Sequence, residues 1–447
     1  MGTQNKARRA AHKRRDKKRT QAQRQTGWTS EDTAQAQELL DDVLAATLVS
    51  AARASAEGDP IAAGACAALL LRDARGVTER QVHKAVGGQL RTVVAALWSH
   101  GWEPLDVHEV SRRRLPAGHL PLVVDAMAAE AARRAAAALD DRWRGQLADL
   151  GAQVWWRPDD VPVGARAGRT GGDPVAVVTA AIEVLACLLE LPVLPSLAAT
   201  AGRPAPTGRT VPTADQQVDE RMLARVRALL AKAESTEFVE EAEALSAKAQ
   251  ELMARHNIGR LAVEAAADEP AAPVARRLWL DAPYVGAKAS LVNAVATANR
   301  CSAVSLEALG FVTVIGAGRD VAATELLVTS LLVQASRALL HPGVAGVRGR
   351  TRGFRQAFLL SYAARVGERL RETSEAVAGD VLGDDLLPVL AASSDRVERA
   401  RRELFPSVTY RSTPIRDRQG WAAGRAAADR AVLPSATALD PVERQAG

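Results

Sequence analysis

The chain has 447 residues, of which 47% are hydrophobic and only 4% are aromatic. This length allows two or three domains, whose cores must be built mainly from Ala, Leu and Val, and such side chains favour close helix packing. The cysteines, Cys66, Cys187 and Cys301, are odd in number and widely spaced. They argue against a disulfide framework or a cysteine-based zinc site and indicate a reducing, cytoplasmic setting. The most apolar stretch, residues 175–194, contains Glu183, Glu190 and Pro192, so it predicts a buried helix and no membrane partner.

Positive charge is concentrated at the N-terminus. Residues 1–26 hold ten Lys or Arg against one acid, Asp16, whereas the other residues hold 48 basic and 51 acidic side chains. Residues 1–27 lack apolar periodicity and are predicted to be a disordered basic tail. The functional interpretation is an arm that contacts DNA or RNA phosphates, and the alternative is a solvated tail that binds nothing in particular. The candidate phosphate contacts in this arm are Lys13, Arg14, Arg15, Lys17, Lys18 and Arg19.

Residues 28–191 are predicted to form an all-helical domain. Thr78-Glu-Arg-Gln81 is a capping box followed by apolar residues at helical spacing, and Asp173-Pro174 is typical of a helix start. The pattern also predicts one helix over residues 120–150 and an irregular Gly/Pro-rich loop over residues 157–172.

A two-helix hairpin is predicted over residues 219–261, between linkers at residues 192–218 and 262–275. Phe238, Ala242, Leu245, Ala249 and Leu252 repeat at spacings of three and four, which is the seam of an antiparallel helix pair. His256 falls in the last turn of the second helix, where a histidine interacts favourably with the free carbonyls, so we interpret it as structural.

The hairpin also carries a family resemblance. The runs RALLAKAEST and EAEALSAKAQELMARHNI resemble the bacterial and phage family called domain of unknown function 2786. More loosely, the region at residues 276–430, including Trp279 and the 354–370 helix, is similar to the domain that accompanies this hairpin. The resemblance implies a fold and no established activity. The motif positions are Leu229, Leu230, Lys232, Ser235, Thr236, Glu243, Lys248, Gln250, Met253, His256 and Asn257.

Residues 276–430 are predicted to be an α+β domain, followed by a tail at residues 431–447. Short strands at Cys301–Leu306 and Phe311–Ile315 should form a β-hairpin, and helices should follow at residues 320–340 and 354–377. The expected fold class is therefore mainly α, with a small hairpin or sheet near the C-terminus.

Two glycine- or arginine-rich segments are candidates for anion binding. Gly316-Ala-Gly-Arg-Asp320 lies between a strand and a helix but lacks a third glycine or a P-loop lysine, so Asp320 is better explained as a helix N-cap. The second segment, which precedes Phe354, Phe358 and Tyr362, can grip phosphates, but its aromatic residues share the inward face of a helix. Its arginines are Arg348, Arg350, Arg352 and Arg355.

No metal, cofactor or catalytic motif is recognised, because HExxH, GxSxG and CxxC patterns are all missing from the sequence. We expect a non-enzymatic protein that associates with nucleic acid through its basic arm. One alternative is a hydrolase-like enzyme with a site in residues 276–430, drawn from Asp281, Glu307, Asp320 and His341. The other is a scaffold whose hairpin seam is completed by a helical protein partner.

Overall fold

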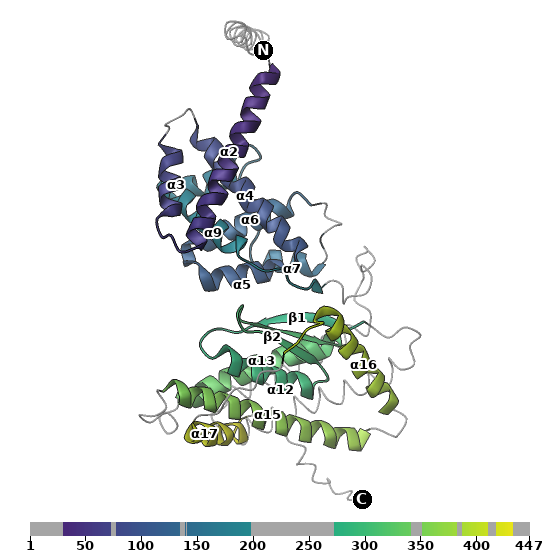
Figure 1. The fold of residues 1–447 in the computed structure, drawn as a ribbon. Helices are drawn as coiled ribbons and strands as arrows, with labels where there is room; N and C mark the ends of the chain where they lie inside the picture. The colour runs from purple at the N-terminus through teal and green to yellow at the C-terminus, as the bar shows by residue number, and fades with distance from the viewer. Residues whose placement is uncertain are drawn as a thin grey trace, which may run out of the picture. The chain divides into compact units, whose positions relative to one another are not determined.

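The computed structural model describes residues 30–72, 77–134, 139, 141–197, 272–340, 351–381, 387–409 and 417–431 (Figure 1). The chain divides into two compact units, Met1–Leu194 and Pro195–Gly447. The fold is mainly helical, with one three-stranded antiparallel sheet in the second unit, and this confirms the predicted fold class. The predicted tail at residues 1–27, the hairpin at residues 219–261 and most of both linkers lie outside the described residues.

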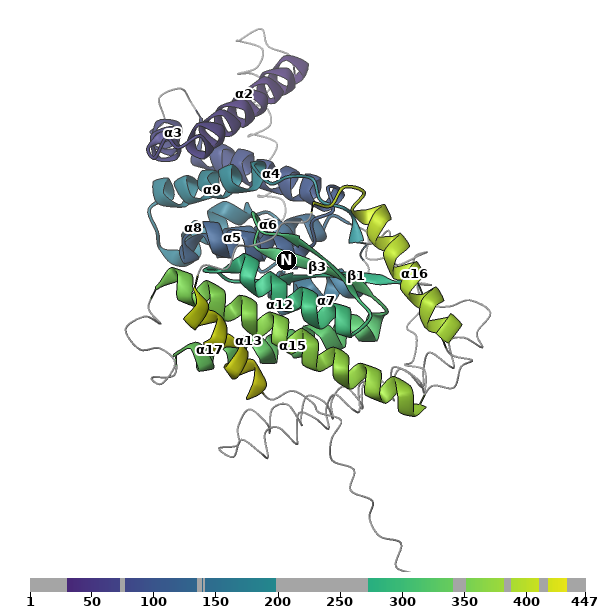
Figure 2. The same ribbon diagram turned by 60° about the horizontal axis from the view of Figure 1, so that its bottom comes forward.

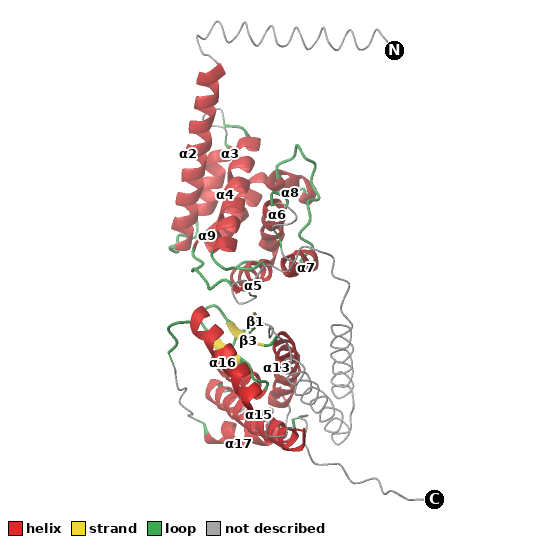
Figure 3. Ribbon diagram, turned by 90° about the vertical axis from the view of Figure 1, so that its right-hand side faces the viewer, coloured by secondary structure: helices red, strands yellow, loops and turns green. Residues whose placement is uncertain are grey.

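The first unit is a helical assembly built around one apolar helix. Its elements are α2 (Ser30–Ala56), α3 (Ala62–Leu71), α4 (Glu79–Ser99), α5 (Pro104–Arg114), the 3-10 turn η1 (Ala117–His119), α6 (Leu120–Ala131), α7 (Asp141–Asp149), α8 (Pro162–Thr170) and α9 (Pro174–Leu189). Helix α9 packs against α2, α3 and α4 (Figure 3). Its sequence is apolar on nearly every side, which is the pattern of a helix surrounded by others.

The predicted start signals of α4 and α9 are confirmed. The Thr78 backbone N–H donates to Gln81 Oε1 at 2.8 Å, and the Gln81 N–H donates back to Thr78 Oγ1 at 3.3 Å. Asp173 Oδ1 accepts from the Val175 N–H at 3.1 Å, with Pro174 in the first helical position. Each cap satisfies backbone N–H groups that have no partner inside the helix.

Two local predictions for this unit were wrong. The helix expected over residues 120–150 ends at Ala131, and α7 begins only at Asp141. After the break, Arg134 bonds Glu130 at 3.2 Å and its guanidinium lies 4.9 Å from the ring centre of Trp98. The loop expected over residues 157–172 contains α8, which starts at Pro162 and is closed by Gly171 in the left-handed region.

The second unit combines the sheet with five helices among its described residues. Its elements are β1 (Val274–Trp279), α12 (Val285–Ala298), β2 (Ser302–Leu306), β3 (Phe311–Gly316), α13 (Gly318–Leu340), α15 (Arg352–Val381), α16 (Leu387–Leu404) and α17 (Arg418–Asp429). The strand order is β1-β3-β2, and β2 pairs with β3 from Leu306↔Phe311 to Ser302↔Ile315. The predicted hairpin is confirmed, whereas β1 was not anticipated and begins inside the expected second linker.

The sheet separates two apolar clusters. Val312 and Val314 face the main core, to which α12, α13 and α15 contribute, and Ile315 faces a smaller cluster with Val397 of α16. This follows from the alternation of side chains along a strand. Figure 2 shows α15 lying between α12 and α17.

Helix α17 approaches α15 through two glycines. A Cβ added at Gly420 would lie 2.5 Å from the carbonyl oxygen of Phe354, and one at Gly424 would lie 2.2 Å from that of Phe358. Only glycine allows the two backbones to come this close. The two glycines of the Gly420-Trp-Ala-Ala-Gly424 run therefore serve helix packing.

Of the described helices, only α13 has the length and apolarity of a membrane span. Val321, Leu327, Val328 and Leu331 of this helix are buried in the main core of the second unit. We therefore interpret α13 as a core helix of that unit.

Candidate functional site

The described part of the arginine-rich segment is the first turn of α15. Thr351 Oγ1 accepts from the Phe354 N–H at 3.2 Å and so caps the helix. Arg352 is exposed and Arg355 is half-buried, and no acidic residue lies in this turn. The charges of these two arginines are unfavourable at the positive end of the helix dipole. An oxyanion bound there would be stabilised by the arginines and by the dipole. A phosphate contact at this turn stays a prediction from the sequence.

The remaining candidate phosphate contacts lie outside the described residues. They are Lys13, Arg14, Arg15, Lys17, Lys18 and Arg19 of the arm, together with Arg348 and Arg350. Their role stays a prediction from the sequence.

The aromatic residues that follow the arginines belong to the core. Phe354, Phe358 and Tyr362 are 4%, 0% and 1% exposed, and the rings of Phe358 and Tyr362 stack at 6.2 Å between centres. Burial raises the pKa of the Tyr362 hydroxyl well above its usual range. These rings cannot stack on bases, so any phosphate contact here lacks an aromatic platform.

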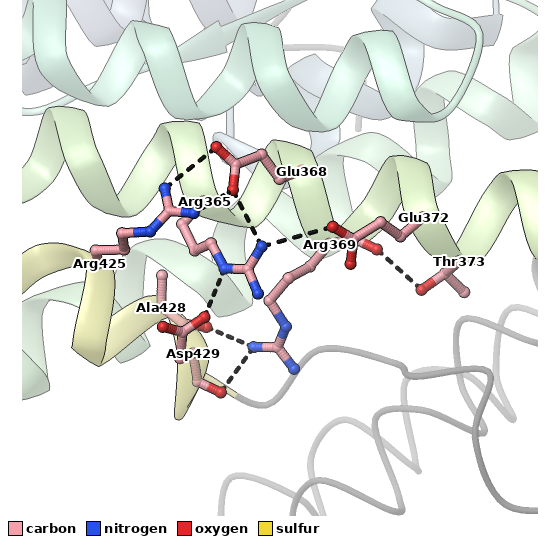
Figure 4. A network of polar contacts seen from close by, with 8 residues as sticks. All are labelled: Arg365, Glu368, Arg369, Glu372, Thr373, Arg425, Ala428 and Asp429. Carbon is pink, nitrogen blue, oxygen red and sulfur yellow. Dashed lines mark hydrogen bonds and ion pairs between the residues drawn. The ribbon is translucent and has the colours of Figure 1, made fainter.

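Further along α15 the arginines are held by α17 (Figure 4). Arg365 Nε donates to Asp429 Oδ1 at 2.5 Å, and Arg425 donates to both carboxylate oxygens of Glu368 at 2.8 and 3.2 Å. Arg369 donates to the main-chain oxygens of Ala428, Asp429 and Ala431 at the end of α17. These guanidiniums join two helices of the same unit, so their hydrogen bonds serve the packing of the fold.

The structure places Asp320 apart from the other two described acidic residues proposed for a hydrolase site. Glu307 is exposed in the β2–β3 turn, with its carboxylate about 3.0 Å from where a Cβ on Gly286 would stand. Asp281 is exposed in the loop before α12, where its carbonyl accepts from Lys288 Nζ at 2.6 Å. Asp320 is buried near the other end of the hairpin, beyond the Ser302↔Ile315 pair. The fourth candidate, His341, lies outside the described residues.

The Gly316–Asp320 segment differs from the expected helix cap. Helix α13 begins at Gly318, so Asp320 is the third helical residue and not the N-cap. Its carboxylate lies 3.5 Å from Arg300, a pairing that spacing along the sequence does not reveal. Gly316 is needed because a Cβ there would stand 2.4 Å from Cys301 Sγ. The glycine serves close packing of a strand against a turn.

Sequence reasoning overlooked His83 of α4. Its side chain is 5% exposed, Nδ1 lies 3.8 Å from Glu79 Oε1, and Nε2 has no hydrogen-bond partner. Burial lowers its pKa, so the ring is neutral near pH 7. It borders a cavity of about 400 Å³ shared with Arg80 and Asp160. The sequence signal that could have identified His83 is its position directly after Val82, on the buried face of a helix. Such a position favours a histidine of the core.

Metal-ligating side chains do not gather in the described parts of the chain. No group of three or more His, Cys, Asp or Glu residues is placed to hold a metal ion there.

Comparison with known proteins identifies one segment. Residues 221–260 match the model of the family described as protein of unknown function (DUF2786). The DUF2786 match confirms the resemblance of the predicted hairpin, and the DUF2786 segment lies outside the described residues. The looser similarity of residues 276–430 to a companion domain stays a prediction. No curated protein and no solved structure was found to match the chain.

Proposed function

We propose that this protein associates with nucleic acid through its N-terminal arm, without reading base sequence. The observation that carries the proposal is the division of charge, with a balance of ten cations to one acid in residues 1–26 and 48 cations to 51 acids elsewhere. Such an arm attracts a polyanion, and the attraction falls steeply with salt. The first turn of α15, with Arg352 and Arg355, is the second phosphate contact.

The ion pairs of the described body support this division. Many of its cations are matched by carboxylates of the same unit, which lowers the net field of the body. Such pairs join Lys84 to Asp41, Arg166 to Asp125, Arg276 to Glu325, Arg401 to Glu398 and Arg425 to Glu368. The surplus of positive charge is therefore carried by the arm.

We also propose that the protein is cytoplasmic. All three cysteines are buried free thiols, which a reducing compartment maintains.

The test is equilibrium binding of the full chain, and of a form starting at residue 27, to labelled single-stranded and duplex DNA and to RNA at several salt concentrations. For the full chain we expect log affinity to fall linearly with log salt, by about 0.9 per duplex phosphate contact and about 0.7 per single-strand contact. The shorter form should lose most of the affinity and show a smaller salt slope.

A matched pair of charge variants separates the arm from total charge. Replacing Arg14, Arg15 and Arg19 by Gln should weaken binding strongly at low salt. Replacing Arg401 and Arg402 by Gln should have little effect, because both already pair with Glu398. Equal affinity of the full chain and the truncated form would refute the proposal.

A further inference from the structure

A polar cavity of about 260 Å³ lies within the second unit, between the C-terminal end of α12, the start of β2 and α16. Three separate elements and one turn contribute to its wall. The lining residues are Asn293, Thr297, Arg300, Cys301, Ser302, Ala303, Ser394, Val397 and Glu398. Neither Arg352 nor Arg355 is among the described residues that line it.

Arg300 supplies the positive pole of the cavity. It stands in the turn between α12 and β2 with a backbone φ of 59°, a left-handed conformation that is unfavourable for a residue with a side chain. One terminal nitrogen lies 3.5 Å from Asp320 Oδ1, and its buried Nε has no hydrogen-bond partner. A guanidinium has five N–H donors in a planar fork, so this contact leaves donors for an oxyanion.

Glu398 supplies a hydrogen-bond acceptor in the part of the wall formed by α16. Arg401 donates to its two carboxylate oxygens at 2.6 and 2.7 Å, and Arg402 donates at 3.0 Å. The hydrogen bonds from these arginines lower the pKa of Glu398 to about 2, so it is ionised at neutral pH. An ionised carboxylate only accepts hydrogen bonds, and it therefore selects a ligand group that donates them, such as a hydroxyl.

The rest of the wall narrows the ligand class. Asn293, Thr297 and Ser394 are exposed residues that add amide and hydroxyl groups to the wall. None of the lining residues that the structure describes is aromatic, so they offer a nucleobase no ring to stack on. The volume lies just under the usual range of about 300–1,000 Å³ for sites of drug-sized ligands, and so suits a smaller molecule.

Covalent chemistry at Cys301 does not fit this cavity. The thiol is buried, and burial raises its pKa to about 12, so it is protonated at neutral pH. Its sulfur is also packed where a side chain on Gly316 would stand. The cavity is suited to reversible binding.

We propose that this cavity binds a small phosphorylated or carboxylated polyol, with the oxyanion on Arg300 and the hydroxyls donating to Glu398. This proposal and the proposed nucleic-acid association rest on different observations, and neither depends on the other.

Isothermal titration of the full chain with ribose 5-phosphate, gluconate, inorganic phosphate and ribose tests the site. We expect ribose 5-phosphate or gluconate to bind more tightly than inorganic phosphate and ribose, and the order of the first two tells which oxyanion is preferred. Arg300→Gln should weaken the preferred probe on the order of tenfold or more, because a charge-assisted hydrogen bond is lost.

Two further variants keep the test independent of the Arg300–Asp320 pair. Ser394→Trp introduces a large side chain from an exposed position of α16 and should abolish binding while the protein remains folded. Glu398→Gln should reduce the preference for the polyol over inorganic phosphate. Arg399→Gln is the matched control, because Arg399 is exposed on the same helix and does not line the cavity.

The circular dichroism spectrum of each variant establishes that it is folded, and Ser394→Trp decides the outcome if Arg300→Gln does not fold. The proposal is overturned if none of the four probes binds the unmodified chain. It is equally overturned if the folded variants Arg300→Gln and Ser394→Trp bind as tightly as the unmodified chain.

Discussion

The two ends of the arginine set on α15 differ in their surroundings although they share one helix and one residue type. Arg352 is exposed in a first turn that contains no acidic residue, whereas Arg365 and Arg369 contact the carboxylates and terminal carbonyls of α17. An arginine that already bonds a neighbouring helix contributes to folding, and one at an unneutralised helix start can contribute to anion binding. The partner, and not the residue type, separates these roles.

The largest effect should come from separating α17 from α15. Gly424→Val places a side chain where a Cβ alone would be 2.2 Å from the Phe358 carbonyl oxygen. We expect a loss of about 3 kcal/mol in the unfolding free energy of the second unit, because the helices must move apart. Urea denaturation followed by circular dichroism measures it.

Gly353→Ala is the control for that substitution, since nothing lies within 4 Å of an added Cβ there. It should be neutral or stabilise the helix by up to about 1 kcal/mol. A similar loss of unfolding free energy in both variants would show that Gly424 is not required for the close approach of α17 to α15.

A smaller loss is expected from removing one docked arginine. Arg369→Met leaves the carbonyls of Ala428, Asp429 and Ala431 without their shared donor. The cost should be about 1–2 kcal/mol in the same denaturation measurement. Arg371→Met, at an exposed position of the same helix, should change stability by less than about 0.5 kcal/mol. If the two variants are equally stable, the docking bonds contribute nothing.

The ion pairs between α15 and α17 should also make the stability of the second unit sensitive to acid. Hydrogen bonds, first from Arg425 and then from Arg365, lower the pKa of Glu368 below its value of 4.5 in the unfolded chain. The folded state therefore binds fewer protons than the unfolded state, and this stabilisation is present above about pH 4.5 and is lost as the pH falls towards the folded pKa. Thermal unfolding between pH 3 and 7 should show a shallower acid decline for Glu368→Gln than for the unmodified chain. The same decline in both would contradict this assignment.

The smallest change in stability is expected at the first turn of α15. Arg352→Glu replaces a cation with an anion at the positive end of the helix dipole, and should stabilise the fold by about 0.3–1 kcal/mol. The same substitution should weaken nucleic-acid binding, because an attraction becomes a repulsion. Arg352→Gln removes the cation without adding an anion. Its affinity for nucleic acid should lie between those of the unmodified chain and of Arg352→Glu. Tighter binding by the Glu variant would remove this turn from the interface.

Local signals in the sequence predicted several elements correctly. The Thr78 capping box, the Asp173-Pro174 start of α9 and the β2–β3 hairpin each depend on residues within a few positions of one another. Cap hydrogen bonds and turn conformations form within such short segments, so their signatures are visible in the sequence. The DUF2786 segment was recognisable for the related reason that its motif is short and dense.

The elements that were missed depend on distant contacts. β1 contains Arg277, a charged residue that is nevertheless buried, because its guanidinium bonds the Pro195 carbonyl and lies over the Phe311 ring. A buried arginine obscures the alternation that indicates a strand. Similarly, the Ala-rich stretch after residue 120 has helical propensity throughout, and propensity alone does not say where a helix stops.

The sequence by itself determined the helical character of the chain, several helix starts, one hairpin and the unequal distribution of charge. Only the tertiary structure decided which arginines are matched by carboxylates, why Gly420 and Gly424 must be glycine, and how Arg300 and Glu398 come to share a cavity. The physical reason is the separation along the chain over which each interaction acts. Caps and periodicity act over a few residues, whereas ion pairs and close backbone contacts join residues that are far apart along the chain and meet only after folding.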